Sequence, residues 1–438
     1  MKQKTLLLGI IFNCMLIMPA WAGGLMTNTN YHIAFDRMMA RGATFDIDAI
    51  YSNPAGLAWG HEGWQLSFNV QKPFQYRNIE AGVPAPLAPA MGFTNHEFKG
   101  KATANPFVPA LFGSYKHDKW AIGLMAGIVG SGGKVTYDEG VPQFVIPVRA
   151  MMGSNGLAPN MYTLDAYMQG KQYIYGVQAN FTYRLNDHWA VAAGLRGNIY
   201  SGFNRGHVIS NAGGAELLNM QIDVDQKGFG MAPLLSLNYR WKGLTLTGRY
   251  EFRTKLNIPN DTKVLSVSPA TVAATVGSMA AAYQDGVKTR YDMPGLLSLA
   301  AGYEILSNLR VTSEFHFFDD KNAKMASNRQ DAIGRGTLEY LCGLEWDINK
   351  TFTVSCGAQR TDYGVSDEYQ TNTSFACDSY SVGLGGAVNI TRHLRVNLGY
   401  FCSIYSDYTR QASYMQVPVT ETYSRTNHVF GVGVDYKF

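Results

Sequence analysis

Three polar residues have types and positions that could support hydrolysis. Ser298 lies in one segment of alternating polarity, and Glu314 and His316 lie in the next segment along the chain. A serine nucleophile, a histidine base and a carboxylate form the triad of many hydrolases. The alternation places all three side chains on an inner face, where such a trio also arises by chance. We therefore expect that the chain is not an enzyme, with a barrel lipase as the less favoured alternative.

The remaining histidines and cysteines show no spacing of a known site. Because no metal-ligand spacing, zinc motif or phosphate loop occurs, we expect neither a metal nor a cofactor. Lone histidines such as His32, His61 and His207 are expected to be solvated. Cys342 and Cys356 fall nearly opposite each other on the outer face of a predicted hairpin, and two free side chains are favoured there over a disulfide.

Charged residues recur at every second position in segments that are otherwise apolar. In one of them, Leu246 and Tyr250 alternate with Thr247, Arg249 and Glu251. A period of two indicates strands with two different faces. Charges at these positions cannot face lipid, so they must point into a polar barrel interior.

The last segment shows the clearest alternation and ends on Phe438, with Phe430 and Val432 on the same face as this residue. Such a terminal aromatic resembles the C-terminal signal that the barrel-assembly machinery reads. We therefore expect that machinery, outer-membrane lipid and lipopolysaccharide as partners.

The N-terminal residues resemble a secretory signal. Two lysines precede an apolar run from Leu6 to Met18, and Ala20-Trp21-Ala22 is a small-x-small cleavage site. The run is shorter than the ~20 residues of a spanning helix. We therefore expect residues 1–22 to be a cleaved signal peptide.

The composition agrees with an exported membrane barrel. Charged residues make up 16% of the chain, against roughly 25% in soluble domains. The formal net charge of +4 comes without the clustered basic residues that nucleic-acid binding needs, so no nucleic-acid partner is expected. We expect an all-β, transmembrane, antiparallel barrel in the bacterial outer membrane.

Short and long connections alternate along residues 63–438, as periplasmic turns and extracellular loops do. Aromatic residues such as Trp189 and Trp241 adjoin the short turns, which indicates a periplasmic girdle. About fourteen strands are expected, near residues 63–76, 105–117, 119–130, 170–185, 189–203, 227–241, 243–255, 289–304, 309–318, 335–346, 351–361, 377–390, 394–405 and 423–438.

Two of the long loops are apolar for their position. Residues 266–283 have the spacing of a short helix, and residues 131–169 are rich in Met and aliphatic side chains. These loops either pack on each other or form a landing site for a hydrophobic ligand, since Met adapts to varied shapes. The candidate ligand-binding residues of the loops are Phe144, Ile146, Met151, Met152, Met161, Val276 and Met279.

Residues 23–62 precede the first strand, do not alternate and are long enough to fold into the lumen as a hatch. They contain the tight-turn sequence Asn53-Pro54-Ala55-Gly56, in which Pro fixes φ and Asn caps the turn. Upstream lie Arg41, Gly42 and Asp48. Phe35, Met38 and Met39 of this segment complete the candidate ligand-binding residues.

This string resembles the signature of the FadL family, the outer-membrane transporters of long-chain fatty acids and aromatic hydrocarbons. Met293-Pro294 followed by Gly302-Tyr303 is similar to a second motif of that family. The resemblance implies a fourteen-stranded barrel whose lumen is blocked by a hatch. It also implies that the protein carries hydrophobic molecules across the membrane without a cofactor. Gating and hatch structure are then expected to depend on Arg41, Gly42, Asp48, Asn53, Pro54, Ala55 and Gly56.

The resemblance also implies lateral release through the barrel wall at a kink in the third strand. The candidate opening comprises Gly127, Gly130, Gly132 and Gly133, although the same glycines could merely begin a loop. A structural or adhesive barrel remains an alternative. A hydrophilic porin needs an open lumen, which the hatch segment argues against.

Overall fold

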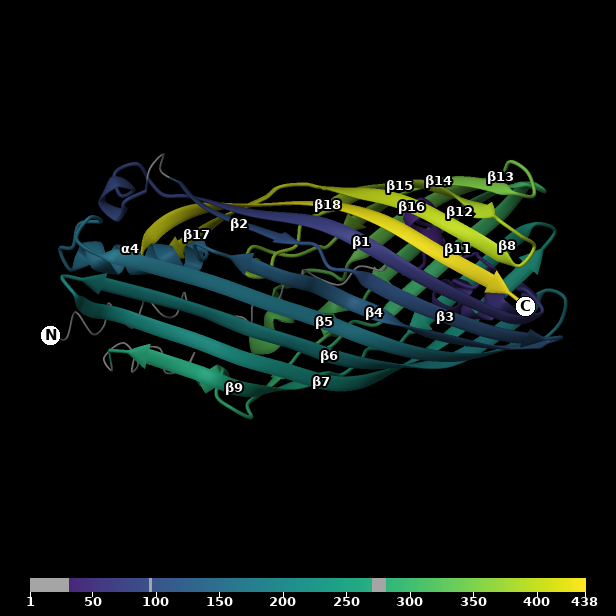
Figure 1. Ribbon diagram of the computed structural model, residues 1–438, viewed down its shortest axis with the longest axis horizontal. Helices are drawn as coiled ribbons and strands as arrows, with labels where there is room; N and C mark the ends of the chain where they lie inside the picture. Colours follow the sequence, from purple (N-terminus) through teal and green to yellow (C-terminus); the bar gives the residue numbers. More distant parts are fainter. Residues whose placement is uncertain (1–30, 94–96, 270–280) are drawn as a thin grey trace.

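The chain folds into a closed antiparallel β-barrel (Figure 1). The computed structural model describes residues 31–93, 97–269 and 281–438. The eighteen strand segments in this part of the chain form one sheet, and β1 pairs with β18 to close it. Four wall strands are each interrupted once, at β2/β3, β8/β9, β10/β11 and β16/β17, so the barrel has fourteen strands. The predicted fold is confirmed.

The first half of the wall contains the longest strands. Its segments are β1 (Gly63–Gly82), β2 (Glu97–Ala104), β3 (Val108–His117), β4 (Trp120–Tyr137), β5 (Thr163–Arg184), β6 (Trp189–Ala212), β7 (Ala215–Trp241), β8 (Leu244–Glu251) and β9 (Asn257–Ser268).

The second half is shorter, except for its last strand. Its segments are β10 (Lys288–Arg290), β11 (Leu296–Leu306), β12 (Leu309–Phe318), β13 (Leu338–Asp347), β14 (Phe352–Asp362), β15 (Ser379–Asn389), β16 (Leu394–Tyr405), β17 (Tyr408–Tyr414) and β18 (Val417–Lys437).

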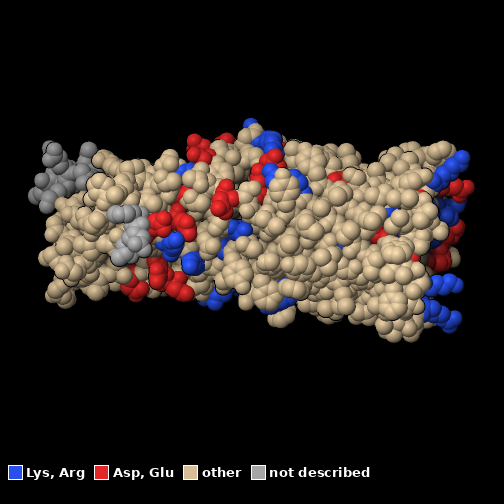
Figure 2. Space-filling view, turned by 90° about the horizontal axis from the view of Figure 1, so that it is seen from above, with Lys and Arg blue, Asp and Glu red and all other residues tan. Residues whose placement is uncertain are grey.

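The alternation places apolar side chains outside and polar ones inside, as expected. Phe430 and Val432 of β18 are about half exposed, whereas Asp435 is buried. Arg249 and Glu251 both point inward and are buried. Figure 2 shows a band almost free of charged residues between the charged turns at one end and a charged zone further along. We interpret this band as the membrane-facing surface.

The strands β5, β6 and β7 are 22, 24 and 27 residues long, about twice the 9–11 residues that cross a membrane. Much of the region expected to form loops at 131–169, 204–226 and 256–288 is therefore strand that continues the wall outside the membrane (Figure 1). The sequence missed these extensions because they lack the lipid-facing apolar residues of the membrane band.

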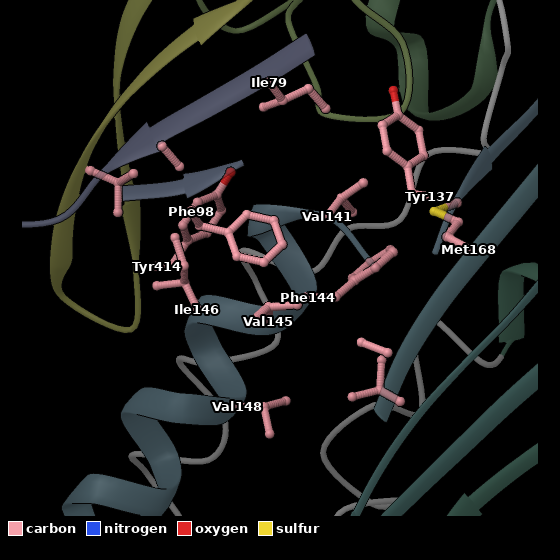
Figure 3. Packing of buried hydrophobic residues seen from close by; sticks show 14 of the residues in the cluster. Ile79, Phe98, Tyr137, Val141, Phe144, Val145, Ile146, Val148, Met168 and Tyr414 are labelled. Carbon is pink, nitrogen blue, oxygen red and sulfur yellow. The ribbon is translucent and has the colours of Figure 1, made fainter. Parts of the chain in front are cut away.

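A helix covers the extracellular end of the barrel. α4 (Pro142–Ser154) buries Phe144, Val145 and Ile146 in a core that also contains Tyr137 and Met168 (Figure 3). The lumen is thus apolar at this end, not polar throughout. The described parts of the loops also contain the 3-10 helices η2 (Pro89–Met91), η4 (Asp320–Asn322) and η5 (Ala326–Ala332).

The prediction of a helix over residues 266–283 is wrong at its start, because Ser266–Ser268 belong to β9. Residues 270–280, with Val276 and Met279, lie outside the described part of the chain. Within the described residues, no helix is both long and apolar enough to cross a membrane.

Candidate functional site: the hatch and the luminal cavity

The segment from residue 31 to residue 62 lies inside the barrel near its C-terminal end (Figure 1). It contains α2 (Ile33–Arg37), α3 (Ala49–Ser52) and η1 (Pro54–Trp59). The predicted tight turn is present: the Asn53 side chain accepts a hydrogen bond from the Gly56 amide at 3.1 Å and donates one to the Thr44 carbonyl at 3.0 Å. Pro54 begins η1, where its missing N–H is not needed.

Arg41 organises the middle of the hatch. Its guanidinium donates two hydrogen bonds to the buried Asp48 carboxylate, at 2.8 and 3.0 Å. The Gly42 amide donates to Glu314 of β12 at 2.8 Å, and a methyl group added at Gly42 would lie 2.5 Å from the Ala300 side chain. The structure therefore brings Arg41, Gly42 and Asp48 together, in a bidentate ion pair held against the wall.

Side chains of the wall also bind the hatch through its backbone. Gln178 and Asn180 of β5 both donate to the Ile50 carbonyl, at 2.7 and 2.6 Å, and Thr182 donates to the Pro54 carbonyl at 2.8 Å. The amide of Ala55 donates to a wall serine at 3.3 Å. These bonds satisfy backbone groups that would otherwise be buried without partners.

The prediction that His32 is solvated is wrong. His32 is 1% exposed, and its Nε2 lies 3.0 Å from an Asp435 oxygen and 3.2 Å from the Ser67 hydroxyl. His61 is partly exposed, and its Nε2 lies 3.2 Å from the Phe438 carbonyl oxygen, while His207 lies 3.1 Å from Asp165. This prediction failed because the carboxylate partner of His32, Asp435, comes from the opposite end of the sequence.

The first hatch helix packs against a row of wall glycines, which we call the glycine track. A methyl group added at Gly343, Gly357 or Gly383 would lie 2.5–2.6 Å from atoms of Met38, Met39 or Asp36. The track consists of Gly343 (β13), Gly357 (β14), Gly383 (β15), Gly399 (β16) and Gly431 (β18). Only residues without a side chain allow the helix to approach the wall so closely.

A cavity of about 170 Å³ lies above the hatch. Phe35 and Met39, two of the candidate ligand-binding residues, contribute to its lining together with Phe401 and Val429 of the wall. The lining also contains ten polar residues that were not predicted, because the type of a single inward-facing strand residue does not indicate a binding site: Gln71, Gln75, Gln172, Gln359, Thr361, Ser379, Ser381, Ser403, Arg425 and Asn427.

The cavity reaches the wall where the interrupted second strand faces β4, at Pro106 and Val108 on one side and Gly130 and Gly133 on the other. The β3–β4 ladder ends at the pair Ala110–Gly127. Beyond it β2 pairs with β1, and no ladder joins β2 to β4 in the described residues. We call this place the β2–β4 seam.

The glycines predicted at the lateral opening border this seam. Gly127, Gly130, Gly132 and Gly133 all lie within β4, so the alternative that they begin a loop is wrong. The pairing of β4 with β5 shifts register twice here, between Ile128 and Gly130 and again before Gly133. Gly133 has φ +71°, a conformation that other residues rarely adopt. The glycines thus produce a local irregularity in the wall.

The other candidate ligand-binding residues lie elsewhere. Met38 lines a separate, periplasmic cavity of about 300 Å³. Phe144 borders a groove of about 70 Å³ beneath the extracellular end. Ile146 and Met152 are buried in the core under α4, and Met151 packs on its edge. Met161 is 54% exposed. The apolar loop therefore packs mainly into the cap and does not reach the central cavity.

The possible hydrolytic trio is not assembled as a triad. Ser298 pairs with His316 across the ladder, but both ring nitrogens of His316 lie 2.7–2.8 Å from carboxylates, those of Glu314 and Glu339. The Ser298 hydroxyl has no hydrogen-bond partner. A histidine held on both nitrogens cannot accept the serine proton in this arrangement.

The cysteines of the β13–β14 hairpin are free and face outward. Cys342 is paired with Ala358, and Cys356 with Leu344, so the two cysteines are diagonal neighbours and not directly opposite.

No protein-family model and no curated protein matches this sequence. Solved structures do match. A FadL homologue of Pseudomonas aeruginosa aligns with a TM-score of 0.69 and 14% identity, covering 95% of this chain and 100% of the homologue. The Pseudomonas putida toluene transporter TodX has a TM-score of 0.58 and 13% identity, over 95% and 100% of the two chains.

The Ralstonia pickettii toluene transporter TbuX aligns similarly, with a TM-score of 0.58 and 12% identity over 93% of this chain and 98% of TbuX. These neighbours are transporters and not enzymes. At such low identity they establish the fold, and the chain therefore has the fold of the FadL-type outer-membrane channels that its hatch motif predicted.

Proposed function

We propose that this protein carries hydrophobic small molecules, with long-chain fatty acids as the leading case, across the outer membrane. Transport is passive: the hatch blocks the route to the periplasm, and the ligand leaves the luminal cavity sideways through the β2–β4 seam. The observation that carries the proposal is the continuity between the cavity and this seam, where both Pro106 and Gly133 line the cavity.

A lateral route has a physical advantage for apolar cargo. A water-filled pore offers such a molecule no favourable environment, whereas a path into the membrane keeps it in apolar surroundings. The seam is suited to this step because its backbone is not tied by a continuous ladder. The hatch, by contrast, is bonded to the wall on several sides.

Closing the seam tests the route. Val108 lines the cavity beside the seam and is 9% exposed, so Val108→Trp should block the seam and lower uptake of a labelled fatty acid severalfold in proteoliposomes. The matched control is Leu111→Trp on the lipid-facing side of the same strand, where the residue is 55% exposed. Uptake that is equal in the two folded variants would contradict lateral release.

Deleting residues 23–35 tests the hatch. The deletion removes much of α2, and it should impair uptake while leaving a folded, heat-modifiable barrel. Unchanged uptake would count against gating by the hatch. A large, steady single-channel conductance of the intact protein would instead favour a porin.

A further inference from the structure

Two arginines face each other at the outer end of the luminal cavity. Arg77 of β1 is paired directly with Arg425 of β18 in the ladder that closes the barrel. Both belong to the inward-facing set of their strands, and Arg425 lines the cavity. Residues directly opposite in an antiparallel pair have Cβ atoms only about 5 Å apart, and like charges there are destabilising.

Neither guanidinium has a carboxylate partner among the described residues. Arg77 is 2% exposed, and its Nε and Nη2 atoms have no hydrogen-bond partner. Arg425 donates to the Gln75 side chain at 3.2 Å, and its Nε is also without a partner. The remaining contacts are aromatic: Arg77 with the Phe375 ring at 5.9 Å and Arg425 with the Tyr405 ring at 4.9 Å.

Of the five other buried arginines in the described residues, four bond to carboxylates, and Arg329 donates to the backbone carbonyls of Tyr369 and Ser374. Arg37 bonds to Glu345, Arg41 to Asp48, and both Arg196 and Arg249 to Glu251. Buried charges are normally compensated in this way, because an unpaired buried charge is costly.

The nearby thiol does not supply the missing charge. Cys377 is buried close to both arginines, and burial raises the pKa of its thiol to about 12, so it stays neutral. The Arg77–Arg425 pair is therefore a cationic site that has no counter-charge among the described residues.

The cavity is cationic at one end and apolar at the other. Arg425 lines its outer end, with Arg77 directly opposite in the ladder, and the cluster of Phe35, Met39, Phe401 and Val429 lies beside the hatch. Such a cavity matches a molecule with an anionic head and an apolar tail. We propose that Arg77 and Arg425 bind the carboxylate of an amphiphilic cargo, and that this protein selects carboxylic acids over neutral hydrocarbons.

This inference rests on the proposed function and narrows its substrate class. Two guanidiniums suit a carboxylate because each can donate two parallel hydrogen bonds to it. A free inorganic anion would satisfy the charges but would leave the apolar end of the cavity unused. The apolar tail therefore distinguishes an amphiphilic carboxylic acid from a free inorganic anion as the ligand of the two arginines.

The test compares binding of a long-chain fatty acid and of the alcohol of equal chain length to the whole protein in a non-ionic detergent. The wild type should bind the acid at least about tenfold more tightly, as expected for charge-assisted hydrogen bonds. Arg77→Gln and Arg425→Gln should each lose most of this preference and keep the affinity for the alcohol. The matched control, Arg360→Gln, removes an arginine that pairs with Asp378 at 3.3 Å and should keep the preference.

Stability of the ligand-free variants supplies a second readout. Removing an uncompensated buried charge should leave the melting temperature unchanged or raise it, whereas loss of a structural contact would lower it. A lowered melting temperature in both variants would contradict the binding role.

Three results would overturn the inference. The first is an acid preference that persists in both glutamine variants, and the second is displacement of the fatty acid by millimolar inorganic phosphate. The third is a wild type that binds the alcohol as tightly as the acid, which leaves the proposed transport function intact. If the wild type binds neither compound, the proposed function itself fails.

Discussion

At the scale of single residues, the glycine track determines how the hatch is seated. A methyl group added at Gly357 would lie 2.6 Å from the Met39 backbone nitrogen, a contact that only movement of the backbone can relieve. Gly357→Val should therefore displace the hatch, at a cost of about 1–3 kcal/mol, and raise single-channel conductance in planar bilayers.

The matched control is Gly248→Val, because a methyl group at Gly248 meets only a Leu299 side-chain carbon at 3.7 Å. Equal, low conductance in both variants would show that the track does not hold the hatch closed.

The structural role of a residue could be predicted from the sequence where it depends on neighbouring residues in the chain. Asn53-Pro54-Ala55-Gly56 is a turn in any context, and the structure forms it with the expected cap. The roles of His32 and of the Arg77–Arg425 pair were not predictable, because their neighbours are more than 300 residues distant along the chain. Only the register of β1 against β18 brings them together.

At the scale of secondary structure, α4 is the cover of the extracellular end. Ile146 is completely buried in the core beneath it, so Ile146→Asp would place an unpaired charge in an apolar site. We expect α4 to detach locally while the barrel stays folded, with faster proteolysis near residues 140–160 and faster binding of fatty acid.

Ala150→Asp on the same helix is the control, because Ala150 is partly exposed. Protease resistance that is the same in both variants would mean that α4 does not move as a separate cover.

The membrane-crossing strands could be predicted closely, and their extensions could not. β12 and β16 have the predicted bounds, 309–318 and 394–405, because lipid outside and polar atoms inside impose strict alternation. Outside the membrane both faces of the wall meet water or protein, so the alternation weakens. The continuation of β6 to Ala212 and the start of β7 at Ala215 were accordingly expected to be loop.

At the scale of the whole molecule, the two halves of the barrel interior are packed by different means. The hatch fills the periplasmic half through ion pairs and backbone hydrogen bonds, and α4 fills the other half through apolar packing. The luminal cavity lies between them, and its lateral border is the seam. Under the proposed function, a ligand from outside would therefore meet an apolar cover first and a polar, firmly bonded plug second.

The two zones of the wall should also differ in their tolerance of charge. Leu235 of β7 is 52% exposed and lies six residues before the girdle residue Trp241, whereas Val264 of β9 is 40% exposed, follows Lys263 and is paired with Asp223. Arginine on the lipid face costs about 2–4 kcal/mol near the bilayer midplane and little near the interface.

Leu235→Arg should accordingly lower the free energy of unfolding in liposomes by that amount, and Val264→Arg should change it little. Denaturant titration of both variants measures this difference directly. Equal losses would place Val264 inside the membrane, and the long strands would then have to lie at a steep tilt instead of rising above the surface.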